Sequence, residues 1–247
     1  DHRKYENQYT IDCHDGKNGL FSAGYRLENL NRPEEQLPLL FLQWYPSLQE
    51  GLEKTALSIG EAMQARTQPP AFHWCSWYYY YSEFDQKQLS ENLEAFQKED
   101  PEKKLRYIQI DAAYSSSIGD WLSPRSYWPK GIEGAVKEIQ DAGYTPGIWI
   151  GPFMVGNRSQ LAADHPDWLL KDEKGELLCQ WAFDNEPKLW GYQDEEYYVL
   201  DTSHPEAMQY LRTVFRTFKR MGIRLFKTDF MLWGLKDSST VTRHTPG

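Results

Sequence analysis

The chain has 247 residues, of which 40% are hydrophobic and 15% are aromatic, so one large domain with a sizeable core is affordable. Its net charge of −9 argues against nucleic acid and an anionic membrane as partners. The three cysteines (Cys13, Cys75 and Cys179) are far apart and odd in number, which disfavours a disulfide framework or a zinc site and leads us to expect a cytoplasmic protein.

The first 70 residues are predicted to form the end of one domain and a connection to the next. The apolar run "LPLLFLQWY" (37–45) predicts a strand, after a polar segment with several turn signals. "SLQE" (47–50) is a capping box that begins a helix, and "TQPP" (67–70) ends the segment. We therefore expect residues 1–45 to be the C-terminal part of a β-rich domain and residues 46–70 to be a linker helix.

From residue 71 onwards, strands alternate with amphipathic helices. The predicted strands cover residues 72–79, 105–111, 145–153 and 223–230. The helices between them are marked by apolar residues on one face, which are Leu89, Leu93 and Phe96, then Ile132, Ala135, Val136 and Ile139, then Leu211, Val214, Phe215 and Phe218. This alternation predicts right-handed βαβ units and a parallel sheet.

Such a sheet belongs either to a doubly wound fold or to a (β/α)8 TIM barrel. No glycine-rich dinucleotide fingerprint follows the first strand, and polar and aromatic residues gather at the C-terminal ends of all four strands, which favours the barrel. Four units make half a barrel. Because an open half would leave sheet edges in water, we expect residues 71–247 to be the first half and the protein to continue past Gly247.

The third crossover, residues 154–222, is far longer than one helix requires. It holds "HPDWLL" (165–170), the turn "DEKGE" (172–176) and a predicted strand "YYVLD" (197–201), before a second capping box, "SHPE" (203–206). We expect an inserted hairpin over the mouth of the site.

The last strand carries Lys227 and Asp229 two positions apart, so both side chains face the barrel axis. The ammonium group would favour the ionised carboxylate that a nucleophile requires. A buried structural ion pair is the alternative. Asp111 closes the second strand, where it is either part of the same site or a helix cap or turn residue.

Aromatic residues stand at the same rim. Trp77, Tyr78 and Trp149 are either packing residues or the floor of a sugar-binding site. Asp120, in "GDW" (119–121), can reach the pocket or cap a turn.

The sequence shows no convincing metal-ligand spacing, no phosphate-binding loop and no Ser/His/Asp order. His165 and His204 each precede a proline, where a role at a helix boundary is expected rather than metal binding. A carboxylate nucleophile and proton transfer suffice for the site, so we expect no cofactor.

Taken together, the motifs resemble those of the α-galactosidases of glycoside hydrolase family 36 over about residues 70–236. They are "WCSWYYY" (74–80), "IQIDAAYSSSIGDWL" (108–122), "PGIWIGPFMV" (146–155), "HPDWLL" (165–170), "YYVLDTSHPE" (197–206) and "FKTDF" (226–230). The resemblance implies a retaining mechanism on a (β/α)8 barrel, preceded by a β-sandwich domain of which residues 1–45 would be the last part.

The resemblance also implies roles for single residues. Asp229 matches the nucleophile, and Lys227 and Asp111 match residues that hold the sugar hydroxyls. The aromatic residues that match the lining of the sugar pocket are Trp77, Tyr78 and Trp149.

Two departures from the family pattern stand out. Ala112 occupies the place of a second aspartate, so one ligand of the sugar hydroxyls is missing. The family's general acid/base comes from a later strand, so we expect it beyond Gly247.

Three functions remain open on this basis. The first is a retaining α-galactosidase acting on oligosaccharides such as raffinose or melibiose. The second is an α-galactosyl transferase resembling raffinose synthase. The third is a catalytically weak sugar-binding relative, which Ala112 motivates. An α-galactoside is the expected partner in each case, and association into a homo-oligomer is plausible because a neighbouring subunit often completes the pocket in this family.

Overall fold

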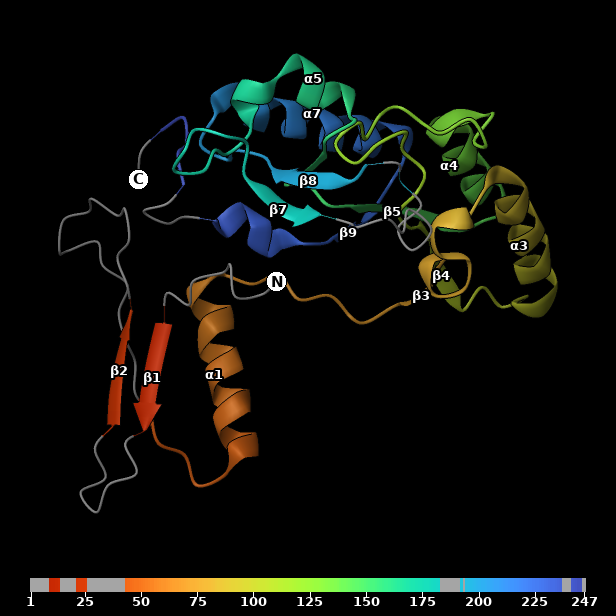
Figure 1. The fold of residues 1–247 in the computed structure, drawn as a ribbon. Helices are drawn as coiled ribbons and strands as arrows, with labels where there is room; N and C mark the ends of the chain where they lie inside the picture. The colour runs from red at the N-terminus through yellow and green to blue at the C-terminus, as the bar shows by residue number, and fades with distance from the viewer. Residues whose placement is uncertain are drawn as a thin grey trace. The chain divides into compact units, whose positions relative to one another are not determined.

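The computed structural model describes residues 9–13, 21–25, 43–182, 192, 194–236 and 241–245 (Figure 1). These residues divide into two compact units, one before and one after residue 70. No helix in the described ranges is long and apolar enough to cross a membrane.

The first unit contains an antiparallel strand pair and one helix. β1 (Tyr9–Cys13) pairs with β2 (Phe21–Tyr25), and no β-sandwich is seen in the described residues. α1 (Leu48–Ala62) begins as predicted, because Ser47 Oγ accepts the Glu50 N–H at 3.2 Å. Residues 37–42 of the predicted strand lie outside the described residues.

Residues 43–45, which complete that prediction, are not part of a strand. They have no partner strand among the described residues, and an extended segment without a partner forms no ladder.

The second unit contains the predicted parallel sheet. Its four strands pair in the order β3-β4-β5-β9. The strands are β3 (Phe72–Cys75), β4 (Leu105–Ile110), β5 (Thr145–Ile150) and β9 (Leu225–Thr228). The helices between them are α3 (Gln86–Glu99), α4 (Gly131–Asp141) and α7 (Pro205–Met221). This run of parallel neighbours in chain order confirms a partial barrel.

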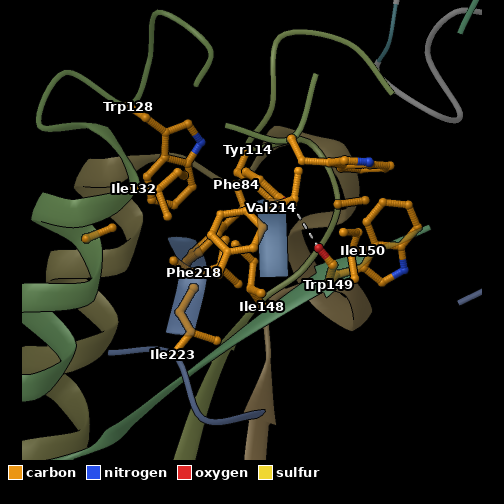
Figure 2. Packing of buried hydrophobic residues seen from close by; sticks show 14 of the residues in the cluster. Phe84, Tyr114, Trp128, Ile132, Ile148, Trp149, Ile150, Val214, Phe218 and Ile223 are labelled. Carbon is orange, nitrogen blue, oxygen red and sulfur yellow. Dashed lines mark hydrogen bonds between the residues drawn. The ribbon is translucent and has the colours of Figure 1, made fainter. Parts of the chain in front are cut away.

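The two faces of the sheet differ in chemistry, because alternate residues of a strand point to opposite sides. Ile108 and Ile148 lie on the face that packs against the helices. Figure 2 shows Ile148 in one cluster with Ile132 of α4 and Phe218 of α7. The other face carries Gln109 and the residues that follow it in alternation, and this is the face on which the site lies.

Three predicted strands extend too far at their C-terminal ends. The strand predicted at 72–79 ends at Cys75, and residues 77–80 form the short helix α2 (Trp77–Tyr80) instead, followed by η3 (Tyr81–Glu83). Ser76 has helical backbone angles, and its carbonyl accepts the N–H of Tyr80.

The strands predicted at 145–153 and 223–230 end at Ile150 and Thr228. Beyond them one more backbone bond joins the two segments, from the Asp229 N–H to the Ile150 carbonyl, and Phe230 then turns the chain away with a φ of 52°. Apolar composition continues into these turns, so it does not mark their start.

The long crossover contains a small sheet of three strands, β6-β8-β7, rather than one hairpin. Its strands are β6 (Met154–Gly156), β7 (Cys179–Ala182) and β8 (Glu196–Val199), with the short helices α5 (Gln160–Asp164) and η4 (Pro166–Trp168) between β6 and β7. β6 starts four residues after the end of β5, so this sheet leaves from the C-terminal ends of the barrel strands.

The N-cap of α7 differs from the one that the capping box at residues 203–206 predicts. His204, not Ser203, is the N-cap, and its ring Nδ1 accepts the Glu206 N–H at 3.3 Å. Ser203 is engaged elsewhere, since its Oγ donates to Asp201 at 2.7 Å. After β9 the chain continues through η5 (Met231–Leu235), and Thr242 then pairs with Lys171 of the long crossover.

Candidate active site

The six predicted site residues all lie at or directly after the C-terminal ends of the parallel strands. Trp149 of β5 is the direct neighbour of Lys227 of β9 in the sheet register. Asp111 follows β4 on the same face, and Asp229 follows β9 two residues after Lys227. Tyr78 lies in α2, directly after β3.

Asp111 is the centre of a dense hydrogen-bond network. It is 1% exposed, and its Oδ2 accepts from Lys227 Nζ at 2.8 Å, Gln109 Nε2 at 2.6 Å and Cys75 Sγ at 3.2 Å. Its Oδ1 accepts the N–H of Ala112 at 2.9 Å. Lys227 therefore does form an ion pair, but its partner is Asp111 and not Asp229, the carboxylate two positions along its own strand.

Lys227 is held in its charged form by this arrangement. Burial favours the neutral amine, but the hydrogen bond and charge of Asp111, with smaller contributions from Cys75 and Asp229, raise the pKa of Lys227 above its ordinary value of 10.5. The stability that the ion pair contributes is thus present below pH 10.5 and is lost as the pH rises through the raised pKa.

Asp229 is oriented by two separate donors. The indole Nε1–H of Trp149 donates to its Oδ2 at 3.0 Å, and the backbone N–H of Phe230 donates to its Oδ1 at 2.9 Å. Both oxygens are thereby fixed, although the residue is only half-buried. A half-buried carboxylate with defined orientation is suited to act as a nucleophile.

Backbone strain follows each of the two carboxylates. Ala113, two residues after Asp111, has a φ of 81°, and Phe230, directly after Asp229, has a φ of 52°. Non-glycine residues rarely adopt such angles, and they cluster at functional sites. The Tyr192 hydroxyl accepts the Ala113 N–H at 2.8 Å and supports the first of these turns.

The three aromatic residues differ in exposure. Tyr78 is 76% exposed, and its ring centre lies 5.7 Å from Lys227 Nζ, so it borders the site. Trp149 is 1% exposed and packs edge-on against Trp121, so in this structure it supports Asp229 from within. Trp77 packs its ring against Tyr81, with the centroids 5.5 Å apart.

Two further candidates from the sequence have structural roles. The Asp120 carboxylate accepts the N–H groups of Gln160 and Leu161 and caps α5. The His165 ring stacks on Trp168. No group of three or more His, Cys, Asp or Glu residues able to hold a metal ion is found in the part of the chain that the structure describes.

Sequence reasoning missed Gln109, Cys75 and Ser76. Gln109 could have been found by the rule that placed Lys227 and Asp229 on one face, because it lies two residues before Asp111 on the same strand. The number and spacing of the cysteines bear only on disulfide and zinc roles for Cys75 and give no signal for a contact with Asp111. It has a free thiol whose pKa burial and the neighbouring Asp111 raise to about 11. Ser76 Oγ accepts the Asp111 N–H at 2.9 Å.

The geometry combines a fixed carboxylate, a separate carboxylate–ammonium pair and an exposed tyrosine ring at one end of a barrel sheet. Carboxylate and ammonium groups form hydrogen bonds with several hydroxyl groups at once, which suits a polyhydroxy ligand. The carboxylate of Asp229 is not part of the ion pair and can attack an electrophilic carbon.

Comparison with known proteins gives a consistent result. The Melibiase family matches residues 75–232. An α-galactosidase from Thermus thermophilus, solved with p-nitrophenyl α-D-galactopyranoside, is 27% identical with a TM-score of 0.59 over 68% of this chain and 32% of that chain. The same enzyme solved with stachyose is 28% identical over 34% of its length, with a TM-score of 0.59.

Among curated proteins, the α-galactosidase AgaA of Geobacillus stearothermophilus is 41% identical over 54 residues, which are 22% of this chain and 7% of that protein. The chain thus spans about a third of the solved relative and a small part of the curated one.

Proposed function

Since the chain belongs to the melibiase family, we propose that it forms the nucleophile-bearing part of a retaining α-galactosidase, which removes terminal α-galactosyl residues from oligosaccharides such as raffinose or melibiose. One observation carries this proposal. Within the family match, Asp229 is oriented by Trp149 and stands apart from the Lys227–Asp111 ion pair, so that the attacking and the sugar-binding groups are separate.

In the proposed reaction, an Asp229 oxygen attacks the anomeric carbon of the galactosyl group. A general acid, expected from a later strand of the barrel, protonates the departing glycosidic oxygen, and a covalent galactosyl-enzyme forms. Water, deprotonated by the same acid/base residue, then displaces Asp229 and releases galactose with its α configuration. The N–H donors of Trp149 and Phe230 hold the carboxylate in line for both steps.

Substrate binding is proposed to use the other side of the site. Lys227 carries further N–H donors for the galactose hydroxyls, Asp111 accepts from one hydroxyl, and the exposed Tyr78 ring borders the sugar. The Thermus relative solved with stachyose supports an oligosaccharide as substrate. Trp149 is buried, so its proposed role is to orient the nucleophile, and only the edge of its ring is available to contact the sugar.

The test uses a protein that carries this chain together with the rest of the barrel. Wild type, Asp229→Ala and the control Asp120→Ala are assayed with p-nitrophenyl α-galactoside, and the corresponding α-glucoside and α-N-acetylgalactosaminide serve as specificity controls. We expect the galactoside to be cleaved by wild type and by Asp120→Ala, whereas Asp229→Ala loses at least about 1,000-fold in kcat. Proton NMR of the first product should show α-galactose. First-formed β-galactose, or an active Asp229→Ala, contradicts the mechanism.

Ala112 favours a second candidate, a sugar-binding relative with weak turnover. Ala112 is buried, and its side chain offers no hydrogen bond at the position next to Asp111. Ligand binding without turnover in the wild type would support this candidate, and a gain of galactoside turnover in Ala112→Asp would identify the cause. A high ratio of transfer to hydrolysis products would instead favour the raffinose-synthase-like transferase.

A further inference from the structure

The carboxylate of Asp111 is engaged unequally at its two oxygens. Oδ2 accepts three hydrogen bonds, from Gln109, Lys227 and Cys75. Oδ1 accepts one within the described part of the chain, from the Ala112 N–H. Each oxygen of a carboxylate offers about two acceptor positions, so Oδ2 is fully used and the remaining position lies at Oδ1.

Gln109 is the donor that lies deepest. It is 1% exposed and precedes Asp111 by two residues on the same face of β4, so Asp111 stands between it and the mouth of the barrel. Its contact of 2.6 Å is shorter than that of Lys227. A buried amide is costly unless it forms hydrogen bonds, and this one is used on the carboxylate oxygen that also receives the lysine.

Cys75 approaches the same oxygen from the neighbouring strand. Its thiol lies 3.2 Å from Oδ2, and β3 pairs Cys75 with Gln109 in the sheet register. The buried Ser76 holds the Asp111 backbone N–H, so the two strand ends are connected at main chain and side chain. Asp111 is therefore fixed from the barrel interior as well as by Lys227.

We propose that Gln109 and Cys75 are positioning residues for substrate binding: they hold Asp111 Oδ2 against Lys227 and leave Oδ1 as the oxygen that accepts a sugar hydroxyl. The proposal rests on the proposed function of this site. It assigns both residues to the binding of the substrate and not to the attack by Asp229, whose donors are Trp149 and Phe230.

Gln109→Met keeps the length of the side chain and removes the amide donor. Asp111 can then rotate away from Lys227, and we expect KM for p-nitrophenyl α-galactoside to rise about 10-fold, with kcat within about 3-fold of wild type. Calorimetric titration with galactose should show a similar loss of affinity. Cys75→Ala should raise KM by about 2- to 3-fold, and Cys75→Ser, which restores a donor, should return it to the wild-type value.

Gln86→Met is a matched control. Gln86 is also a buried glutamine, at 5% exposed, and donates its Nε2 to a carboxylate, that of Glu138, at 3.0 Å. This pair joins α3 to α4, in the helix layer. We expect both glutamine variants to lower Tm and Gln109→Met alone to change KM and galactose affinity.

The outcomes separate this inference from the proposed function. An active wild type together with an unchanged KM and galactose affinity in Gln109→Met overturns the positioning role alone. Equal changes of KM in the two glutamine variants also overturn it, because they would reflect a general loss of structure. A wild type that neither cleaves an α-galactoside nor binds galactose overturns the proposed function, and the positioning role with it.

Discussion

At the scale of single residues, the two carboxylates of the site are held in different ways. Asp111 is buried and neutralised by Lys227, whereas Asp229 receives its hydrogen bonds from uncharged donors and keeps an exposed side. A cation bound directly to the nucleophile would stabilise its charge and weaken its attack. The separation therefore suits a site in which one carboxylate binds and the other reacts.

The indole of Trp149 offers a direct test at this scale. Trp149→Phe keeps an aromatic ring and removes the N–H that donates to Asp229, a bond to a charged group of about 1.5–3 kcal/mol. We expect kcat/KM for an α-galactoside to fall about 10- to 100-fold. Trp121→Phe, in the ring packed against Trp149, is the control and should retain most activity. Equal losses in both variants would show that packing and not the hydrogen bond matters.

The Lys227–Asp111 pair should show strong coupling. Lys227→Met leaves Asp111 as a buried carboxylate without its counter-charge, and we expect a loss of about 1.5–3 kcal/mol in the free energy of unfolding. Adding Asp111→Asn removes that charge, so the double variant should be less destabilised than the sum of the single variants. Urea unfolding measures all four proteins. Additive effects would mean that the two groups do not interact in solution.

At the scale of elements, the chain is shaped by how helices and turns end. α7 ends at Gly222, which has a φ of 118°, a conformation that glycine adopts without the strain of a side chain. The chain can therefore turn from α7 into β9, and this strand places Lys227 and Asp229 at the site. The hairpin turn at Gly175, with a φ of 82°, uses the same property in open space.

These two glycines give a matched comparison. Gly175→Ala should cost about 1 kcal/mol for its conformation alone, since nothing lies within 4 Å of the added Cβ. Gly222→Ala places a Cβ 2.2 Å from Gln140 Nε2, but this atom ends an exposed, flexible side chain that can move aside, so we expect a cost within about 1 kcal/mol of that at Gly175. Denaturant unfolding of both variants measures the difference. A much larger cost at Gly222 would show that Gln140 does not move away.

Asp194 connects the long crossover to a loop of the barrel by hydrogen bonds. This buried carboxylate accepts from the N–H of Arg158 at 3.0 Å and from Ser117 Oγ at 3.3 Å. Burial raises its pKa above the ordinary 3.8, and the hydrogen bonds oppose that change in part. The folded protein thus binds this proton more tightly than the unfolded chain does.

A pH dependence of stability follows. As the pH falls through the raised pKa towards 3.8, wild type should gain stability relative to Asp194→Asn, whose side chain does not titrate. The free energies of unfolding of both proteins, measured between neutral pH and about pH 4, give the difference. A difference that stays constant, or that moves against wild type on acidification, would contradict the raised pKa.

At the scale of the whole molecule, the parallel sheet has an edge strand on each side within the described part of the chain. β3 and β9 each have one partner strand among the described strands, and Phe72 at the β3 edge is 74% exposed. Edge strands with apolar residues pair readily with other chains. A complete barrel removes both edges, and by the proposed mechanism it also brings the general acid close to Asp229.

Residues 71–247 expressed alone should therefore self-associate. We expect size-exclusion chromatography with light scattering to show species larger than a monomer, and an assay with p-nitrophenyl α-galactoside to show no turnover. A protein that carries the complete barrel should elute as defined species and be active. A stable, cooperative monomer of residues 71–247 would contradict the account of its edges.

The sequence by itself determined the parallel α/β architecture, the chain order of the four strands and the gathering of Lys227, Asp229 and Asp111 at one end of the sheet. Periodicity and strand ends are local properties, so they can be read without coordinates. The resemblance of six motifs added the family. The ends of the strands at Cys75, Ile150 and Thr228 could not be predicted in this way, because apolar composition continues into the turns.

Only the tertiary structure decided which groups contact one another. Lys227 faces two carboxylates, and its pairing with Asp111 depends on the register of β4, β5 and β9. Gln109 and Cys75 contact the same oxygen for that reason, although the two residues are 34 positions apart in sequence. Partner choice among side chains is set by distances of a few tenths of an ångström across the sheet, and no spacing along the chain encodes them.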